Sequence, residues 1–284
     1  MGMTEPNLPT LRDVTFITVA YGSVKVLPGL WETLPIGSRL IIIDNGPADG
    51  LEAWASVRNI VYKKMHTNVG FGSACNEGAK LAKSEWLFFV NPDVRLFEDS
   101  FDQFMRGISL HPQALGFGPV LVNSAGEQHF KRHGRLSNVR ISNNAPKGDL
   151  IVPFLSGVAL VIKRSAFETV NGFDPKIFLY FEDDDLCHRI SQLPGTLVLL
   201  AECQVTHLGG KASFGIDDLD KFKEFHYGKS ETQVLAKHLG RNRALLNLLI
   251  SAIKLLNPRT IVNRQRRTVR LARLSGATTA LRDN

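Results

Sequence analysis

The first third of the chain alternates between apolar runs and segments of helical character. The runs Val14–Ala20, Leu40–Asp44 and Trp86–Val90 are rich in β-branched and aromatic residues, and turn-forming residues follow each of them. Nearly continuous apolar runs of this length are typical of strands buried on both faces. Residues 24–34 and 72–83 are expected to form helices, and residues 59–64 a short third strand. This alternation predicts an α/β fold with a mixed, mainly parallel sheet flanked by helices.

Polar residues stand directly after these apolar runs. Tyr21, Asp44 and Asp93 each lie at or just past the end of one. In open sheets of this kind, ligands bind at the carboxyl ends of the strands. The sequence therefore predicts a ligand site at that edge of the sheet.

Four consecutive acids, Glu182, Asp183, Asp184 and Asp185, stand between apolar neighbours. Adjacent carboxylates repel one another, and apolar surroundings make their desolvation costly. A cation, an arginine or a role in proton transfer would compensate for this cost. The alternative is the acidic first turn of a surface helix, which the helix dipole favours. Asp185 and Arg189, at positions i and i+4, are expected to form a structural ion pair.

The middle of the chain contains fewer regular elements. Residues 124–150 are polar with little periodicity, and we expect a long excursion such as a flap. Beyond it, residues 154–161 and 196–201 are predicted strands, and residues 165–170 form a predicted short helix.

The C-terminal segment differs in charge from the rest of the chain. The formal net charge is +7, but residues 232–282 contain eleven Lys or Arg and no Asp or Glu, so the remainder is mildly acidic. We therefore predict an α/β domain over residues 1–230 and a C-terminal basic amphipathic helical extension over residues 231–284. Its apolar stripe consists of Leu245, Leu249, Ile253 and Leu256, and the arginines that follow are Arg264, Arg266, Arg267, Arg270 and Arg273.

A basic amphipathic helix suits an anionic membrane surface. The alternatives are a helix docked on the body with solvated arginines, and a homodimer interface formed by the apolar stripe. Nucleic acid is not expected as a partner, because the basic segment has no aromatic residues for base stacking.

Several features bear on where the chain acts. No apolar run approaches the roughly 18 to 20 residues that a membrane span needs. The N-terminus lacks the charged and apolar regions of a signal peptide. Cys75, Cys187 and Cys203 lack metal-type spacing, and we expect reduced thiols in the core. These features favour a cytoplasmic protein, peripheral at the inner membrane face.

Three sets of residues are candidates for binding chemistry. Asp93, close to Asn91, could hold Mg²⁺ or Mn²⁺ while substrate phosphates fill the remaining ligand positions, although turns of this composition are common. His207 would shift the preference toward Mn²⁺ if it shared that metal. Two glycines, Gly70 and Gly72, stand where a helix is expected to begin and could let a phosphate approach. They do not complete a dinucleotide-binding or P-loop motif.

In their order along the chain, these motifs resemble the inverting family 2 glycosyltransferases of the GT-A fold, especially the rhamnosyltransferase-like branch. The resemblance covers about residues 13–215. The matching residues are 14–21, 43–46, 68–72 with Asn76, 91–94, 155–157, 172–174, 181–186 with Arg189, and His207.

The resemblance implies a role for each of these positions. Asp183 would be the general base, with Asp184 as a competitor that the sequence does not eliminate. Asp93 and His207 would hold Mg²⁺ or Mn²⁺, although Asn91 replaces the first acid of the family's metal motif. The residues that would contact the nucleotide donor are Thr18, Tyr21, Asp44, Gly70, Phe71, Asn76 and Asn91. The residues that would shape the sugar and acceptor pocket are Ser156, Gly157, Phe181 and Glu182.

The function that the resemblance implies is transfer of a sugar, with rhamnose from dTDP-rhamnose favoured, to a saccharide or polyprenyl-linked saccharide in bacterial polysaccharide synthesis. A UDP-sugar donor is the alternative within the family. Outside it, the alternatives are a nicotinamide-dependent oxidoreductase and a non-catalytic membrane-binding protein. The incomplete glycine motif and the late acidic cluster count against the oxidoreductase.

Overall fold

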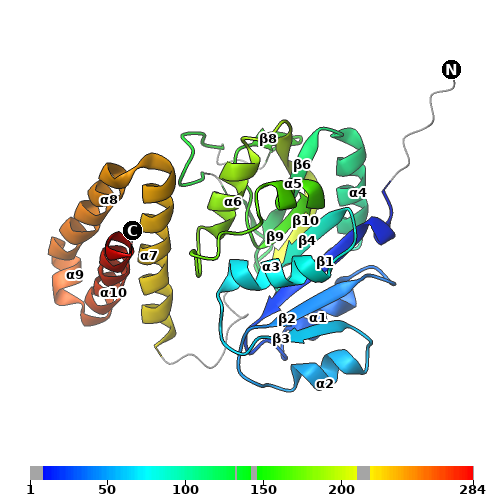
Figure 1. The fold of residues 1–284 in the computed structure, drawn as a ribbon, viewed down its shortest axis with the longest axis horizontal. Coiled ribbons are helices and arrows are strands. Elements are labelled where there is room, and N and C mark those ends of the chain that lie inside the picture. Colours follow the sequence, from blue (N-terminus) through cyan, green and yellow to red (C-terminus); the bar gives the residue numbers. More distant parts are fainter. Residues whose placement is uncertain (1–8, 132, 142–145, 210–217, 284) are drawn as a thin grey trace.

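A computed structural model of the chain describes residues 9–283, except residues 132, 142–145 and 210–217. Its centre is a mixed sheet with the strand order β3-β2-β1-β4-β9-β6-β10-β5; β7 pairs with β6, and β8 with β10 (Figure 1). The strands are β1 Val14–Ala20, β2 Leu40–Asp44, β3 Val61–Lys64, β4 Trp86–Val90, β5 Val94–Leu96, β6 Ala114–Val122, β7 Gln128–His129, β8 Leu150–Val152, β9 Ala159–Lys163 and β10 Thr196–His207. The predicted α/β fold with a mixed sheet is confirmed.

The sheet topology brings the polar strand ends together. Strands β1 to β4 pair in parallel, and β9 is antiparallel to both β4 and β6. Strand β6 therefore runs in the same direction as β1, and so does β10, which pairs in parallel with β6. The carboxyl ends of all these strands meet at one edge. The antiparallel pairing of β5 with β10 places His207 opposite Val94, next to Asp93 in the chain.

Helices cover both faces of the sheet (Figure 1). Helices α1 Leu27–Thr33, α2 Leu51–Ser56 and α4 Ser100–Leu110 pack on one face. Helices α3 Phe71–Leu81, α5 Arg164–Thr169 and α6 Glu182–Ile190 pack on the other. Alternate strand residues point to opposite faces, so Phe16 joins the first core and Ile17 the second. The three cysteines are buried and unpaired, as predicted.

One predicted strand is corrected by the structure. Residues 154–161 were expected to be a strand, but β9 begins only at Ala159. The preceding backbone has a different partner: the N–H of Gly157 donates to the carboxylate of Asp183. Phe154 and Leu155 are still buried in the core beneath α6.

The C-terminal helices form a group beside the α/β body, with α7 next to α6 (Figure 1). They are α7 Leu219–Leu239, α8 Arg241–Ile253, α9 Pro258–Val262 and α10 Arg264–Arg282, with the 3₁₀ turn η2 Lys254–Leu256 after α8; a further turn, η1 Leu11–Asp13, precedes β1. Helices α7 and α10 approach closely at two glycines: a Cβ on Gly228 would contact the Arg273 carbonyl, and one on Gly276 the Phe225 carbonyl. The predicted domain boundary at residues 230/231 falls inside α7, so we place the start of the helical extension at Leu219.

Candidate active site

The acidic cluster forms the first turn of α6, but Glu182, Asp184 and Asp185 are buried, so α6 is not the surface helix that one interpretation of the sequence expected. Tyr180 and Phe181, directly before it, both adopt the left-handed backbone conformation, with φ of 67° and 64°. Two consecutive bulky residues in this conformation are strained, and such strain persists only where the surroundings hold it. Helix α7 supplies these contacts: the Ser230 hydroxyl donates to the Leu179 carbonyl, and Tyr227 packs against Phe181 at a ring separation of 4.8 Å.

Asp183 combines firm anchoring with partial access to solvent. Its Oδ2 accepts hydrogen bonds from the N–H of Gly157 and from Lys131 Nζ, both at 2.9 Å. Its side chain is 17% exposed, whereas that of Asp184 is 6% exposed. Of these two acids, Asp183 is therefore the one that an incoming hydroxyl can reach more readily.

Asp184, the other candidate for the base, is buried. Its Oδ1 accepts the N–H of Arg135 at 3.2 Å, and its Oδ2 lies 3.1 Å from Lys131 Nζ. Burial and the adjacent charge of Asp183 raise its pKa. Glu182 is also buried; burial and Asp183 raise its pKa to about 8. At neutral pH, a proton on Glu182 relieves much of the repulsion within the cluster.

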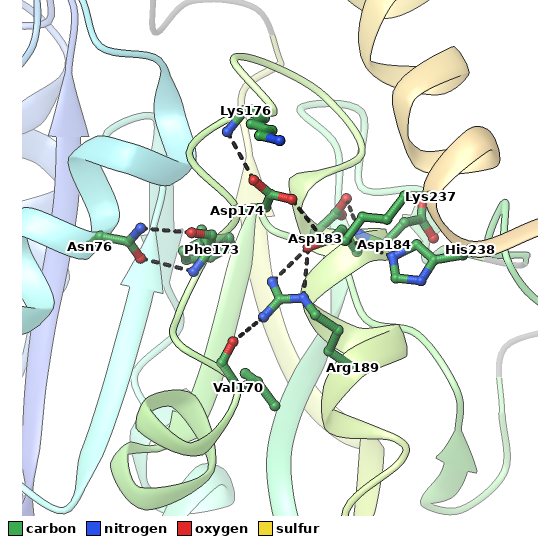
Figure 2. Close-up of polar contacts among 11 residues, drawn as sticks. Asn76, Val170, Phe173, Asp174, Lys176, Asp183, Asp184, Arg189, Lys237 and His238 are labelled. Carbon is green, nitrogen blue, oxygen red and sulfur yellow. Dashed lines mark hydrogen bonds and ion pairs between the residues drawn. The ribbon is translucent and has the colours of Figure 1, made fainter. Parts of the chain in front are cut away.

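Asp185 is the structural member of the cluster. Figure 2 shows Arg189 of α6 close to Lys237 and His238 of α7, and all three side chains contact Asp185. Arg189 donates to Asp185 from both Nε and a terminal nitrogen, at 2.9 and 2.6 Å, which confirms the predicted pair. Lys237 Nζ and His238 Nε2 lie 2.6 and 2.7 Å from the other oxygen. Burial acts in the opposite direction, but these partners hold the pKa of Asp185 below its usual range. The carboxylate thus connects the acidic helix to α7.

Asp93 and His207 meet at the sheet edge. Asp93 follows β4, His207 ends β10, and His207 Nε2 lies 3.5 Å from Asp93 Oδ1. Asp93 is fully buried, and neither of its oxygens has a hydrogen-bond partner among the described residues. A buried carboxylate without partners is costly, and a metal ion would satisfy it. The pair therefore fits a divalent cation, although the described residues contain no third histidine, cysteine or acid placed to complete a protein-only site.

A pocket opens close to this pair. Its lining includes Tyr21, Gly70, Phe71 and Asn91 from the predicted donor-binding set. Gly70 must be glycine because its φ is +85° and a Cβ there would contact the Phe178 carbonyl at 2.4 Å. This close approach joins the start of α3 to the loop that leads into the acidic cluster.

Three other residues of the predicted donor-binding set do not line this pocket. The Thr18 hydroxyl is buried, with no hydrogen-bond partner in the described part of the chain. The Asp44 carboxylate accepts hydrogen bonds from the Tyr62 hydroxyl at 2.7 Å and from Lys64 Nζ at 2.8 Å, so it already has partners within the protein. Asn76 exchanges hydrogen bonds with the Phe173 backbone and lines a separate hollow near α3 (Figure 2). In this structure Asn76 positions the chain around Phe173 and does not line the pocket of Tyr21 and Gly70.

The predicted acceptor residues gather around Asp183. Gly157 bonds to it directly, and a Cβ on Gly157 would lie 3.2 Å from the Asp183 Cβ. Ser156 precedes Gly157, and its hydroxyl accepts the Val158 N–H at 3.4 Å. Phe181 and Glu182 stand immediately before Asp183 on the chain.

Sequence reasoning missed three residues at the site. Lys131 lies in the excursion predicted as a flap, and no local pattern marked it. Asn45 ties the pocket together through Asn68 and Gly70; its position after a strand was the available signal. Lys223 lines the same pocket as Tyr21 and Gly70 from α7, a helix that was assigned mainly to a separate extension.

The comparison with known families agrees with this geometry. The family model described as glycosyl transferase family 2 matches residues 15–170. The chain belongs to glycosyltransferase family 2. The match spans β1 to α5 and so includes Asp93 and the pocket residues Tyr21, Gly70, Phe71 and Asn91.

Curated relatives place the chain near the rhamnosyltransferases. It is 27% identical over 201 residues to N-acetylglucosaminyl-diphospho-decaprenol L-rhamnosyltransferase of Mycobacterium tuberculosis, an alignment covering 59% of this chain and 66% of the relative. It is 26% identical over 145 residues to rhamnosyltransferase WbbL of Escherichia coli K12, covering 46% of this chain and 55% of the relative. The aligned region thus spans somewhat less than two thirds of the length of these relatives.

A solved structure supports the GT-A fold. The mannosyltransferase PcManGT from Pyrobaculum calidifontis, in complex with GDP-Man and Mn²⁺, superposes with a TM-score of 0.61. The match covers 96% of this chain and 88% of that chain at 13% sequence identity. At this identity the likeness establishes the fold alone.

Proposed function

We propose that this family 2 enzyme is an inverting, metal-assisted transferase that moves a sugar from a nucleotide donor to a saccharide or polyprenyl-linked saccharide. The observation that carries the proposal is a pair of dissimilar acids, Asp93 and Asp183. Asp93 is buried without a hydrogen-bond partner in the described part of the chain, whereas Asp183 is anchored and partly accessible. An inverting transfer needs two such groups, one on the diphosphate side of the sugar and one on the acceptor side.

Each residue of the site has a separate role in this reaction. Asp183 accepts the proton of the acceptor hydroxyl while that oxygen attacks the anomeric carbon and the bond to the nucleotide diphosphate breaks. Tyr21, Gly70, Phe71 and Asn91 hold the donor in the pocket. Asp93 and His207 would hold Mg²⁺ or Mn²⁺, which when bound supplies positive charge beside the departing diphosphate.

The sugar and the acceptor are proposed from the relatives. Two of them are named rhamnosyltransferases, and one name specifies a diphospho-decaprenol-linked saccharide. We therefore favour rhamnose from dTDP-rhamnose, with a UDP-sugar as the alternative, and place the reaction in bacterial polysaccharide synthesis.

Nucleotide binding tests the proposal directly. We expect dTDP or UDP to bind the full chain in calorimetry only when Mn²⁺ or Mg²⁺ is present, and NAD⁺ not to bind. The donor sugar that transfers to a lipid-linked acceptor then identifies the substrate. Metal-independent NAD⁺ binding, or no diphosphate binding under any condition, would contradict the proposal.

We also propose that the C-terminal helices bind an anionic membrane surface from the cytoplasmic side. No helix among the described residues has the length and apolar character needed to cross a bilayer. However, the apolar stripe of Leu245, Leu249, Ile253 and Leu256 is exposed, and Arg264, Arg266 and Arg267 are exposed after it. Exposed apolar residues combined with arginines suit acidic lipid headgroups.

Vesicle flotation tests the membrane proposal. Replacing Leu249 and Ile253 with Glu removes about 1.5 kcal/mol or more of apolar transfer per side chain. Binding to phosphatidylglycerol vesicles is therefore expected to fall at least about tenfold. Ile151→Glu is the control, since Ile151 is exposed on β8 of the body. The proposal fails if the double variant floats as well as wild type, or if wild type binds neutral vesicles as well as acidic ones. If the double variant is instead a monomer where wild type is a dimer in light scattering, the stripe is a homodimer interface.

A further inference from the structure

Lys131 lies between the carboxylates of Asp183 and Asp184. Its Nζ is 2.9 Å from Asp183 Oδ2 and 3.1 Å from Asp184 Oδ2. The three side chains are 20% exposed or less, so water screens these ion pairs weakly. Burial alone would lower the pKa of Lys131, but the two carboxylates outweigh it and raise the pKa, so the lysine is charged.

The segment that carries Lys131 is fixed on both sides of it. Strand β7, just before it, pairs with the end of β6, and the Phe130 ring is buried in the core. After it, Gly134 lies so close to α6 that a Cβ would be 2.9 Å from Asp184 Oδ1. The backbone, and not a free side chain alone, thus places the ammonium group beside the acids.

The groups around Asp183 make an ion pair there necessary. The acids Glu182 and Asp184 and the buried thiol of Cys187 face it from α6. Arg135, from the same segment as Lys131, directs its guanidinium to Glu231 of α7 at 2.8 Å. Lys131 is thus the cation that contacts Asp183 among the described residues.

Glu182, the acid directly before Asp183 in the chain, shows the effect of these surroundings. Burial and the charge of Asp183 raise the pKa of Glu182 to about 8, so this residue keeps its proton at neutral pH. Asp183 stands between Glu182 and Asp184 in the same helical turn. A protonated Asp183 could not accept a proton from a hydroxyl.

We propose that Lys131 is a positioning residue that keeps the Asp183 carboxylate ionised and oriented beside Gly157, so that Asp183 can act as the base near neutral pH. This inference rests on the proposed sugar transfer. Lys131 itself need not touch the substrate, because its effect passes through Asp183.

The pH profile of kcat/KM tests the proposal, since a merely structural role would lower activity without moving the profile. For Lys131→Met we expect the acidic limb to move up by about one to two pH units, because an opposite charge at this distance depresses a carboxyl pKa by that order. Lys131→Arg keeps the charge and should restore the wild-type limb. Lys147→Met removes an exposed lysine from the same excursion and should leave the limb unchanged. An unmoved limb in Lys131→Met overturns the proposal.

A second measurement separates this proposal from the proposed function. If wild type transfers no sugar from any donor, the function fails, and thermal unfolding between pH 8 and 5 then tests the ion pair alone. The difference in Tm between wild type and Lys131→Met should shrink as pH falls, because the variant's Asp183 takes up a proton first. A constant difference would overturn the role of Lys131. If Lys131→Met does not fold, Lys131→Gln replaces it in both measurements.

Discussion

Asp183→Asn is expected to lower kcat for sugar transfer about a thousandfold, within the range that general bases contribute. Asparagine has nearly the same shape but cannot accept a proton from the acceptor hydroxyl. Nucleoside diphosphate binding should change little, because the contacts of Asp183 are to Lys131, Gly157 and the Asp184 backbone and not to the donor pocket. Steady-state kinetics and calorimetry on the same preparation check both parts.

Asp184→Asn is the matched control for this experiment. It changes an equally charged neighbour that also contacts Lys131 but is less accessible. We expect a smaller loss in kcat, accompanied by a lower Tm, because Asp184 also accepts the backbone N–H of Arg135. If Asp184→Asn abolishes transfer while Asp183→Asn retains a tenth or more of kcat, the base is Asp184.

Asp93→Asn is expected to weaken Mn²⁺-dependent binding of the nucleoside diphosphate at least about a hundredfold. Even indirect partners of a metal are worth about ten- to a hundredfold in affinity, and Asp93 is proposed as a direct ligand. Transfer should fall correspondingly. Titration calorimetry with and without Mn²⁺ measures the change, and unaltered metal-dependent affinity would remove Asp93 from the site.

Metal-free Asp93→Asn should in contrast be more stable than metal-free wild type. The substitution replaces a buried acid whose oxygens lack partners in the described part of the chain. Relieving such a group is worth about 1 to 3 kcal/mol, or several degrees in Tm. Asp99→Asn, at an exposed acid beyond β5, is the control. It should change neither the Tm nor the Mn²⁺-dependent affinity for the nucleoside diphosphate. A lower Tm for metal-free Asp93→Asn would mean that the carboxylate has a structural partner.

Local sequence was sufficient for the elements that are buried on both faces. Strands β1, β2 and β4 are predicted at their observed bounds, since each is a nearly continuous apolar run. Strand β6 was not predicted, although it lies inside the sheet. Gly116, Gly118 and Pro119 interrupt its pattern, and the glycines are explained only by neighbours: a Cβ on Gly116 would lie 2.5 Å from Ile162, and one on Gly118 2.9 Å from Leu155.

The residues of the candidate site likewise fall into those that the local sequence marks and those that it does not. Asp93 and the acidic cluster could be found because a carboxylate after a buried strand, or four acids between apolar residues, is unusual within a few residues of chain. Lys131 could not be found, because nothing near it in the sequence is unusual and its partner Asp183 lies 52 residues away.

The sequence by itself thus determined the parallel strands and the polar residues at their ends, because burial and turn preferences are properties of short segments. Tertiary structure alone decided which of the four acids remains accessible, which one is bound to α7, and which cation lies between Asp183 and Asp184. Those outcomes depend on how β7 pairs with β6 and how α7 contacts α6. Both are contacts between distant segments, whose geometry no local pattern encodes.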